Sequence, residues 1–168
     1  PDISAIDGID PFDPCIRQIR NAGFTAFCTV PGSSNLVGGT GIAVKLKDVQ
    51  CVDDMMMPEC QPLKMAIGEN PKLTYGKKGM APGSRMGIAA LIRKTFTEAG
   101  LYLEKRLKGT LDAPVRAQEP LADALEGKRL VKIHCHTAQD ITMAVRLAEE
   151  FSLNYTLEHV TSGRFAAE

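Results

Sequence analysis

Short apolar runs that end in polar clusters alternate with amphipathic stretches along the second half of the chain. Residues 130–133 form a brief, partly β-branched apolar run, which is typical of a buried strand rather than a helix. Thr137 and Asp140 then have the three-residue spacing of a capping box, so a helix is predicted to begin there. Residues 154–160 are a second strand-like run. His134 and His136 follow the first run, and His159 is the next-to-last residue of the second, so all of the histidine is predicted to lie at two neighbouring strand ends.

Helical periodicity predicts three further helices. The longest runs from Ser84 to about Lys108 and has one apolar stripe opposite a charged side. A first helix begins after Asp13, which suits a capping position, and ends at Gly23. A shorter helix covers residues 119–125. Helices therefore separate the strand-like runs in the carboxyl-terminal half.

Strands are also predicted in the amino-terminal half, at residues 24–30, 41–47 and 62–67. The small-residue segment 32–41 is predicted to be a loop, and it lacks the lysine and the glycine spacing of nucleotide-binding loops. The basic, glycine-rich segment 72–84 is predicted to be a mobile loop beside the site. This order of elements favours an α/β fold with a parallel sheet or barrel, in one domain without a second.

Charge and cysteine content narrow the functional class. Lysine plus arginine and aspartate plus glutamate each number 20 in 168 residues, so the net charge indicates neither nucleic acid nor an anionic membrane as a partner. No apolar run approaches the roughly 18 residues of a membrane span. The 5 cysteines are scattered, odd in number and without a C-x-x-C pair, which favours a reducing compartment. We therefore expect a soluble, cytoplasmic protein.

Three histidines and one carboxylate are the candidate ligands of a divalent metal ion. His134 and His136 end one predicted strand, and His159 ends the next. Glu69 follows an earlier strand and lies between helix-breaking residues, so it is predicted to be a non-helical carboxylate at a strand end. Imidazole and carboxylate suit zinc and similar ions, and α/β folds place their chemistry at the carboxyl ends of strands. Each histidine alone is also compatible with a structural role, and Glu69 with a solvated one.

Four stretches in this order resemble the metal-dependent amidohydrolase superfamily, in particular its imidazolonepropionase-like branch. The resemblance runs over essentially the whole chain, and the order and spacing of the stretches are more specific than any one of them. The stretches are residues 6–13 (IDGIDPFD), residues 31–39 (PGSSNLVGG), residues 65–72 (MAIGENPK), and the histidine motifs at 134–136 (HCH) and 158–160 (EHV).

The resemblance implies a distorted (β/α)8 TIM-like barrel with one or two divalent metal ions at its carboxyl mouth, zinc being favoured. By matching positions, His134 is the metal ligand from strand five and His159 the ligand from strand six. Glu69 is the first choice for the middle ligand and Lys64 the second. His136 contacts the substrate or supports a ligand, or exchanges roles with His134.

The first-strand H-x-H and the strand-eight aspartate of that family have no match in this sequence. The resemblance therefore implies that residues 1–168 are the central part of one barrel, about strands two to six. The implied activity is metal-dependent hydrolysis of an amide, cyclic amide or ureide carbon–nitrogen bond, in which the metal activates water and a carboxylate takes its proton. Two alternatives stay open: a non-catalytic α/β binding or regulatory domain with structural histidines, and an inactive barrel fragment that pairs its strand edges as a homo-oligomer.

Overall fold

The computed structural model describes residues 2–167 and has a mixed α/β architecture with two β-sheets. The larger sheet has the strand order β2-β5-β6-β7. β5, β6 and β7 run parallel, whereas β2 is antiparallel to β5. The predicted parallel arrangement is therefore present in the strands that carry the histidines. The bounds of the four strands are Val37–Thr40, Leu63–Ala66, Val131–Cys135 and Tyr155–His159.

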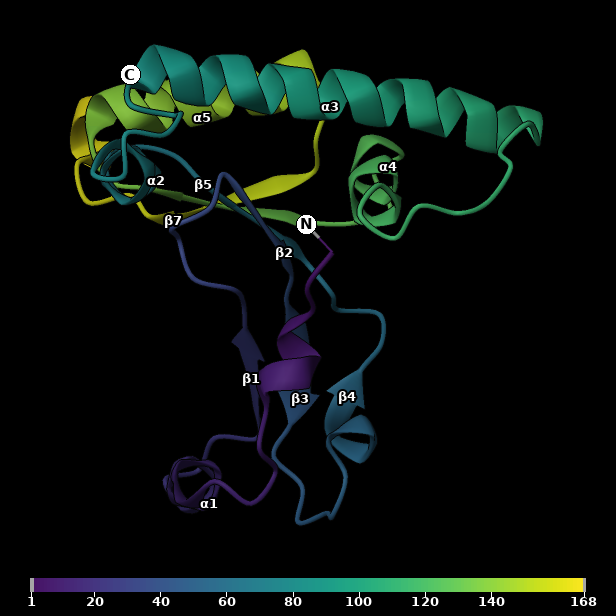
Figure 1. Ribbon diagram of the computed structural model, residues 1–168. Helices are drawn as coiled ribbons and strands as arrows, with labels where there is room; N and C mark the ends of the chain where they lie inside the picture. The colour runs from purple at the N-terminus through teal and green to yellow at the C-terminus, as the bar shows by residue number, and fades with distance from the viewer. Residues whose placement is uncertain (1, 168) are drawn as a thin grey trace.

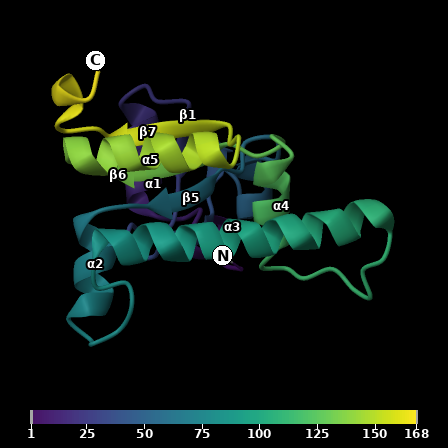
Figure 2. The same ribbon diagram turned by 90° about the horizontal axis from the view of Figure 1, so that it is seen from above.

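Helices cover one face of the larger sheet (Figure 1). The view from above shows α3 and α5 running side by side across it (Figure 2). Leu63 and Met65 of β5, with Val131 and Ile133 of β6, belong to the hydrophobic cluster under these helices. Lys64 of β5, Lys132 and His134 of β6, and Thr156 and Glu158 of β7 alternate with these residues and therefore point to the opposite face. The helices of this layer are α3 (Arg85–Lys108), α4 (Glu119–Leu125) and α5 (Ala138–Glu150).

A second, antiparallel sheet projects away from the helical layer, with α1 beside it (Figure 1). Its strand order is β1-β3-β4, and a separate hydrophobic cluster forms here. The described chain therefore has two hydrophobic cores rather than one. The elements are α1 (Pro14–Asn21), β1 (Ala26–Thr29), β3 (Ile42–Lys45) and β4 (Met56–Met57), and the buried cluster comprises Ile16, Ile42, Val44, Leu46 and Met55.

Capping residues set three helix starts where the sequence predicted them. The side chains of Asp13, Ser84 and Thr137 each accept a hydrogen bond from a backbone N–H in the first turn of α1, α3 and α5. Gly109 ends α3 in the left-handed conformation, with φ 67°. These predictions are confirmed. Three short 3-10 helices, Ala5–Gly8, Val52–Met55 and Gly163–Phe165, accompany the longer elements.

The prediction of a simple loop over residues 32–41 is wrong, because Val37–Thr40 forms β2. Glycine at this place permits close approach of two backbone segments rather than a turn. Gly39 has φ 120°, and a Cβ atom there would lie 2.4 Å from the carbonyl oxygen of Ile3. The N–H of Thr40 donates to the same oxygen at 3.0 Å.

The prediction of a mobile loop over residues 72–84 is wrong in its first part, and so is the non-helical prediction for Glu69. Glu69 and residues 72–76 lie in the helix α2, which spans Glu69–Gly76. Pro71 is tolerated because it lies in the first turn, where N–H groups have no partner within the helix. The carboxylate at the helix start also pairs with Lys72 in the same turn, at 2.8 Å.

Residues 2–167 form no closed barrel. The larger sheet ends at β2 on one side and β7 on the other, and these two strands are not paired with each other. The antiparallel β2 also departs from the all-parallel arrangement of a regular (β/α)8 barrel. Among the same residues, no helix combines the length and the apolar character that crossing a bilayer requires.

Candidate metal centre

Three histidines meet at the carboxyl ends of β6 and β7. His134 lies on β6, His136 follows that strand, and His159 ends β7. One candidate ligand nitrogen from each ring lies within 4.8 Å of those of the other two rings. The ring of His134 is edge-on to both other rings, with centroids 4.6 Å away, and the rings of His136 and His159 stack at 4.8 Å. The sheet thus brings together the three histidines that the sequence singled out.

An unusual backbone conformation places His159 in this group. The parallel ladder pairs His159 with Cys135, whose side chain is buried in the main hydrophobic cluster. A regular strand would direct the histidine to the same side. Instead, His159 has φ 72° and Val160 has φ 49°, in the left-handed region that costs a non-glycine residue about 1 kcal/mol or more. This turn at the strand end accompanies the contact of His159 with His134.

The environment of His134 keeps its imidazole neutral. The residue is 4% exposed, and burial lowers its pKa to about 4. Electrostatic interactions with Lys64, His136 and His159 act in the same direction. At neutral pH the ring is therefore uncharged and retains one nitrogen lone pair, as a cation ligand requires. Its Nε2 lies 3.1 Å from Nδ2 of Asn70.

The groups next to the histidines have different roles. His136 is exposed, and its Nδ1 lies 2.8 Å from the hydroxyl oxygen of Thr161, within hydrogen-bond distance. Cys135, between the two β6 histidines, has no exposed surface, and burial raises the pKa of its thiol to about 11. A thiol with so high a pKa stays protonated, so Cys135 acts as a core residue rather than a ligand.

The structure does not bring Glu69 into the histidine group. Its carboxylate pairs with Lys72 at 2.8 Å and Arg85 at 3.2 Å, and 47% of its side chain is exposed. Lys64 is only 5% exposed, and burial lowers its pKa. Its charge lowers the pKa of His134. Of the two candidates for the middle ligand, Lys64 is thus the one that acts electrostatically on the histidine group.

A buried ion pair lies under the turn between β5 and α2. Asp140 is 1% exposed, pairs with Nε of Arg85 at 2.7 Å and accepts a hydrogen bond from the Thr137 hydroxyl at 2.6 Å. Burial acts to raise the pKa of Asp140, but these hydrogen bonds hold it below its ordinary value. Gly68 passes so close that a Cβ atom there would lie 2.6 Å from the carboxylate. Sequence reasoning missed this pair, because its members lie 55 residues apart and no local pattern connects them.

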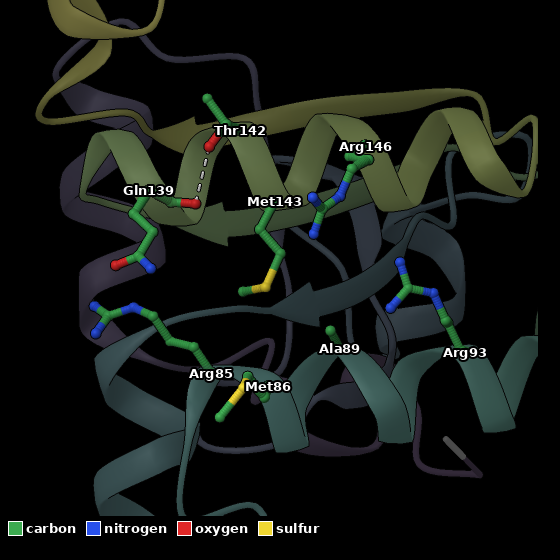
Figure 3. Close-up of a pocket in the computed structure, with 8 residues that line it drawn as sticks. All are labelled: Arg85, Met86, Ala89, Arg93, Gln139, Thr142, Met143 and Arg146. Atoms are coloured by element: carbon green, nitrogen blue, oxygen red, sulfur yellow. Dashed lines mark hydrogen bonds between the residues drawn. The ribbon is translucent and has the colours of Figure 1, made fainter.

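A groove of about 440 Å³ lies between α3 and α5, on the helical side of the sheet. Figure 3 shows Met143 pointing into it, with Arg85 at one end and Arg93 and Arg146 towards the other. None of the three histidines lines this groove, so it is separate from the candidate metal centre. The remaining lining residues are Met86, Ala89, Gln139 and Thr142.

The histidine group fits a zinc ion as a donor set. Three protein ligands with a fourth position open are typical of catalytic zinc, and imidazole is among its preferred donors. Tetrahedral bonds of about 2.0–2.1 Å place ligand nitrogens roughly 3.4 Å apart. Because the candidate nitrogens lie within 4.8 Å of one another, the rings would need to approach by up to about 1.4 Å.

Comparisons with known proteins show what the chain as a whole is similar to. No protein-family profile matches the chain. A curated protein named "Amidohydrolase tasK", from Hapsidospora irregularis, is 28% identical in a match that covers 88% of this chain and 17% of that protein. The crystal structure of an amidohydrolase from Thermotoga maritima MSB8 matches with a TM-score of 0.89 and 37% identity, over 95% of this chain and 43% of that one. Both similarities support an amidohydrolase family.

The similarity to these amidohydrolases extends over most of the chain, so it supports the mixed α/β architecture as a whole. The chain spans less than half the length of either amidohydrolase.

Proposed function

We propose that this chain is the metal-binding part of a metal-dependent hydrolase that cleaves an amide, cyclic amide or ureide carbon–nitrogen bond. The observation that carries this proposal is the group of three histidines at adjacent parallel strand ends, in a chain similar to two amidohydrolases. This edge of an α/β sheet is where such folds place catalytic groups. The motifs at residues 6–13, 31–39 and 65–72 favour the imidazolonepropionase-like branch.

His134 and His159 are the proposed metal ligands, and the exposed His136 is proposed to contact the substrate or to take the place of one of them. A divalent ion, zinc by preference, supplies a water of lowered pKa and a Lewis acid for the carbonyl oxygen. Glu69 stays a candidate for the middle ligand, but it would first have to leave its two cationic partners. Lys64 needs no such exchange, but its ammonium group has no lone pair, so it would hold a cation only after losing a proton or becoming carboxylated.

We further propose that the active form is a longer protein, in which residues 1–168 are the central part of one barrel domain. Both relatives are more than twice as long as the part that this chain matches. β5, β6 and β7 are parallel neighbours covered by helices on one face, as consecutive strands of a (β/α)8 barrel are. A cytoplasmic location, a small-molecule substrate and self-association through the outer edge of β7 belong to the same proposal.

Zinc affinity tests the site directly. The 168-residue chain, freed of metal with a chelator, is titrated with zinc against a chromogenic competitor. We expect binding by the wild type and a dissociation constant raised by more than about 100-fold in His134→Ala and His159→Ala, because each change removes a ligand. Exposed thiols also bind zinc, so the matched control replaces Cys15, Cys28 and Cys51 by serine. That variant is expected to bind zinc as the wild type does.

Two outcomes separate the alternatives. If both histidine variants melt at lower temperature but bind zinc unchanged, the histidines are structural and a binding or regulatory domain is favoured. If zinc binding depends on them, the longer protein is assayed for hydrolysis of amide, cyclic amide and ureide substrates with and without zinc. Failure to hydrolyse any of the three would contradict the proposed activity.

A further inference from the structure

The side chain of Asn70 connects the segment before β2 with the buried ring of His134. Its Nδ2 lies 2.7 Å from the hydroxyl oxygen of Ser33 and 3.1 Å from Nε2 of His134. Both partners are distant from Asn70 in the sequence: Ser33 lies 37 positions before it and His134 lies 64 positions after it. Asn70 itself lies in the first turn of α2, directly before the buried Pro71. The fold therefore holds an amide group against one nitrogen of a candidate metal ligand.

The orientation of this amide determines which nitrogen of His134 is free. A side-chain amide has two N–H donors on one atom and an acceptor on the other, and a half-turn exchanges them. When the amide nitrogen faces Nε2, it donates to that atom, and the proton of the neutral ring is on Nδ1. The ring then has no free lone pair for a cation. When the amide oxygen faces Nε2, the ring donates Nε2–H to it, and Nδ1 has a free lone pair.

The other partner of Asn70 permits both orientations. The hydroxyl of Ser33 can accept a hydrogen bond from the amide nitrogen or donate one to the amide oxygen. Turning the amide therefore leaves this contact satisfied, so Ser33 holds Asn70 beside the His134 ring in either orientation. In metal sites, a ligating histidine almost always donates its second ring N–H to an oxygen acceptor or water.

We propose that Asn70 is a positioning residue that sets the tautomer of His134. In the cation-binding form, His134 carries its proton on Nε2, hydrogen-bonded to the amide oxygen of Asn70, and presents Nδ1 as the ligand atom. The statement about the ligand atom rests on the proposed function, whereas control of the tautomer by Asn70 does not require a metal.

A second contact of the same segment supplies a matched control. The hydroxyl of Tyr75, on α2, donates a hydrogen bond to the side-chain oxygen of Asn35. This bond also joins α2 to the segment before β2, but among the described residues neither of its members is hydrogen-bonded to His134. Tyr75→Phe thus weakens the docking of the segment without changing the partner of the histidine ring.

The experiment determines the His134 tautomer by long-range ¹H–¹⁵N correlation NMR on uniformly ¹⁵N-labelled protein near pH 8, first with chelator and then with zinc. In zinc-free Asn70→Asp, we expect the Nε2–H tautomer, because a carboxylate only accepts hydrogen bonds. Zinc-bound wild type is expected to show the same tautomer. The zinc dissociation constant should rise by about 10- to 100-fold in Asn70→Ala. The zinc dissociation constants of Asn70→Asp and Tyr75→Phe should stay within about threefold of the wild-type value. Asn70→Asp keeps an oxygen acceptor beside Nε2, and Tyr75→Phe leaves Asn70 unchanged.

Several results would overturn the proposal. These are an Nδ1–H tautomer in zinc-bound wild type, an Nδ1–H tautomer in zinc-free Asn70→Asp, and an unchanged zinc affinity in Asn70→Ala. If the wild type binds no zinc at all, the proposed function fails. The tautomer of zinc-free Asn70→Asp then still decides whether Asn70 controls His134.

Discussion

His134 combines, in one residue, the properties that a cation ligand needs and those that make a protein sensitive to acid. It is buried, its ring is neutral, and positive charges lie close to it. The same environment that preserves a lone pair for a metal opposes uptake of a proton. A residue that suits metal binding should therefore also leave a signature in the pH dependence of the metal-free protein.

We predict that the metal-free chain loses stability as the pH falls from about 6.5 to 4. The pKa of His134 is about 4 in the folded state against 6.5 for an ordinary histidine, so the unfolded chain binds more protons in this window. The free energy of unfolding should therefore decrease by about 3 kcal/mol on acidification. Urea unfolding with chelator at pH 7.5 and 4.5 measures the change. The loss of unfolding free energy between these two pH values should be smaller in His134→Asn. A loss in that variant equal to the wild-type loss would refute the assignment to His134.

Gly68 is a residue that no other amino acid should replace without loss. We predict that Gly68→Ala destabilises the protein more than Gly79→Ala. Both glycines have positive φ, which alone costs alanine about 1 kcal/mol, and Gly68 also has ψ −140°, close to a region that essentially only glycine adopts. At Gly79 the added Cβ meets nothing within 4 Å, whereas at Gly68 it lies 2.6 Å from the Asp140 carboxylate.

Because Arg85 and Thr137 hold that carboxylate, the clash should cost a further 1–3 kcal/mol or so. Chemical denaturation of the two variants in parallel gives the difference. Equal losses in both would mean that the carboxylate yields easily to the new methyl group.

At the level of elements, the contacts of α3 with its neighbours differ in strength along one helix. Arg85 near its start pairs with the buried Asp140, while Arg93, two turns later, pairs with Glu150 on the surface. Both arginines line the same groove (Figure 3). The helix is thus attached to α5 by one buried and one exposed ion pair.

We predict that Arg85→Ala destabilises the protein by about 3 kcal/mol, since it leaves the carboxylate of Asp140 buried and unpaired. Arg93→Ala should cost less than about 1 kcal/mol, because both members of its pair are well exposed, at 40% and 39%. Thermal and denaturant unfolding measure both, and a loss in Arg93→Ala as large as that in Arg85→Ala would contradict the argument.

The same elements show how far the sequence could predict the fold. β6, α3 and α5 follow from hydrophobic periodicity and from caps such as Ser84 and Thr137, which are local signals. α2 and β2 were missed, because Pro71 and Gly39 indicate breaks unless the tertiary partners are known. For the site, the position of the three histidines at predicted strand ends indicated that they lie together. The contact of Asn70 with His134 could not be predicted, because it depends on how α2 packs against β6.

At the scale of the whole molecule, two separate hydrophobic clusters stabilise different parts of the described chain. The main cluster lies between the larger sheet and its helices, and the second lies between α1 and the β1-β3-β4 sheet. The histidine group belongs to the larger sheet. Stability of the site should therefore depend mainly on the main cluster.

We predict that the two parts open independently in the native state. Val44→Ala and Val131→Ala are a matched pair, because each valine has no exposed surface and each substitution should cost about 2 kcal/mol. Hydrogen exchange measured by mass spectrometry should speed up in β1, β3 and β4 for Val44→Ala, and in β5, β6 and β7 for Val131→Ala. Zinc affinity should fall only in the second variant. If Val44→Ala accelerates exchange in β6 as strongly as in β3, the two clusters unfold as one unit, and the smaller sheet then contributes to holding the histidines in place.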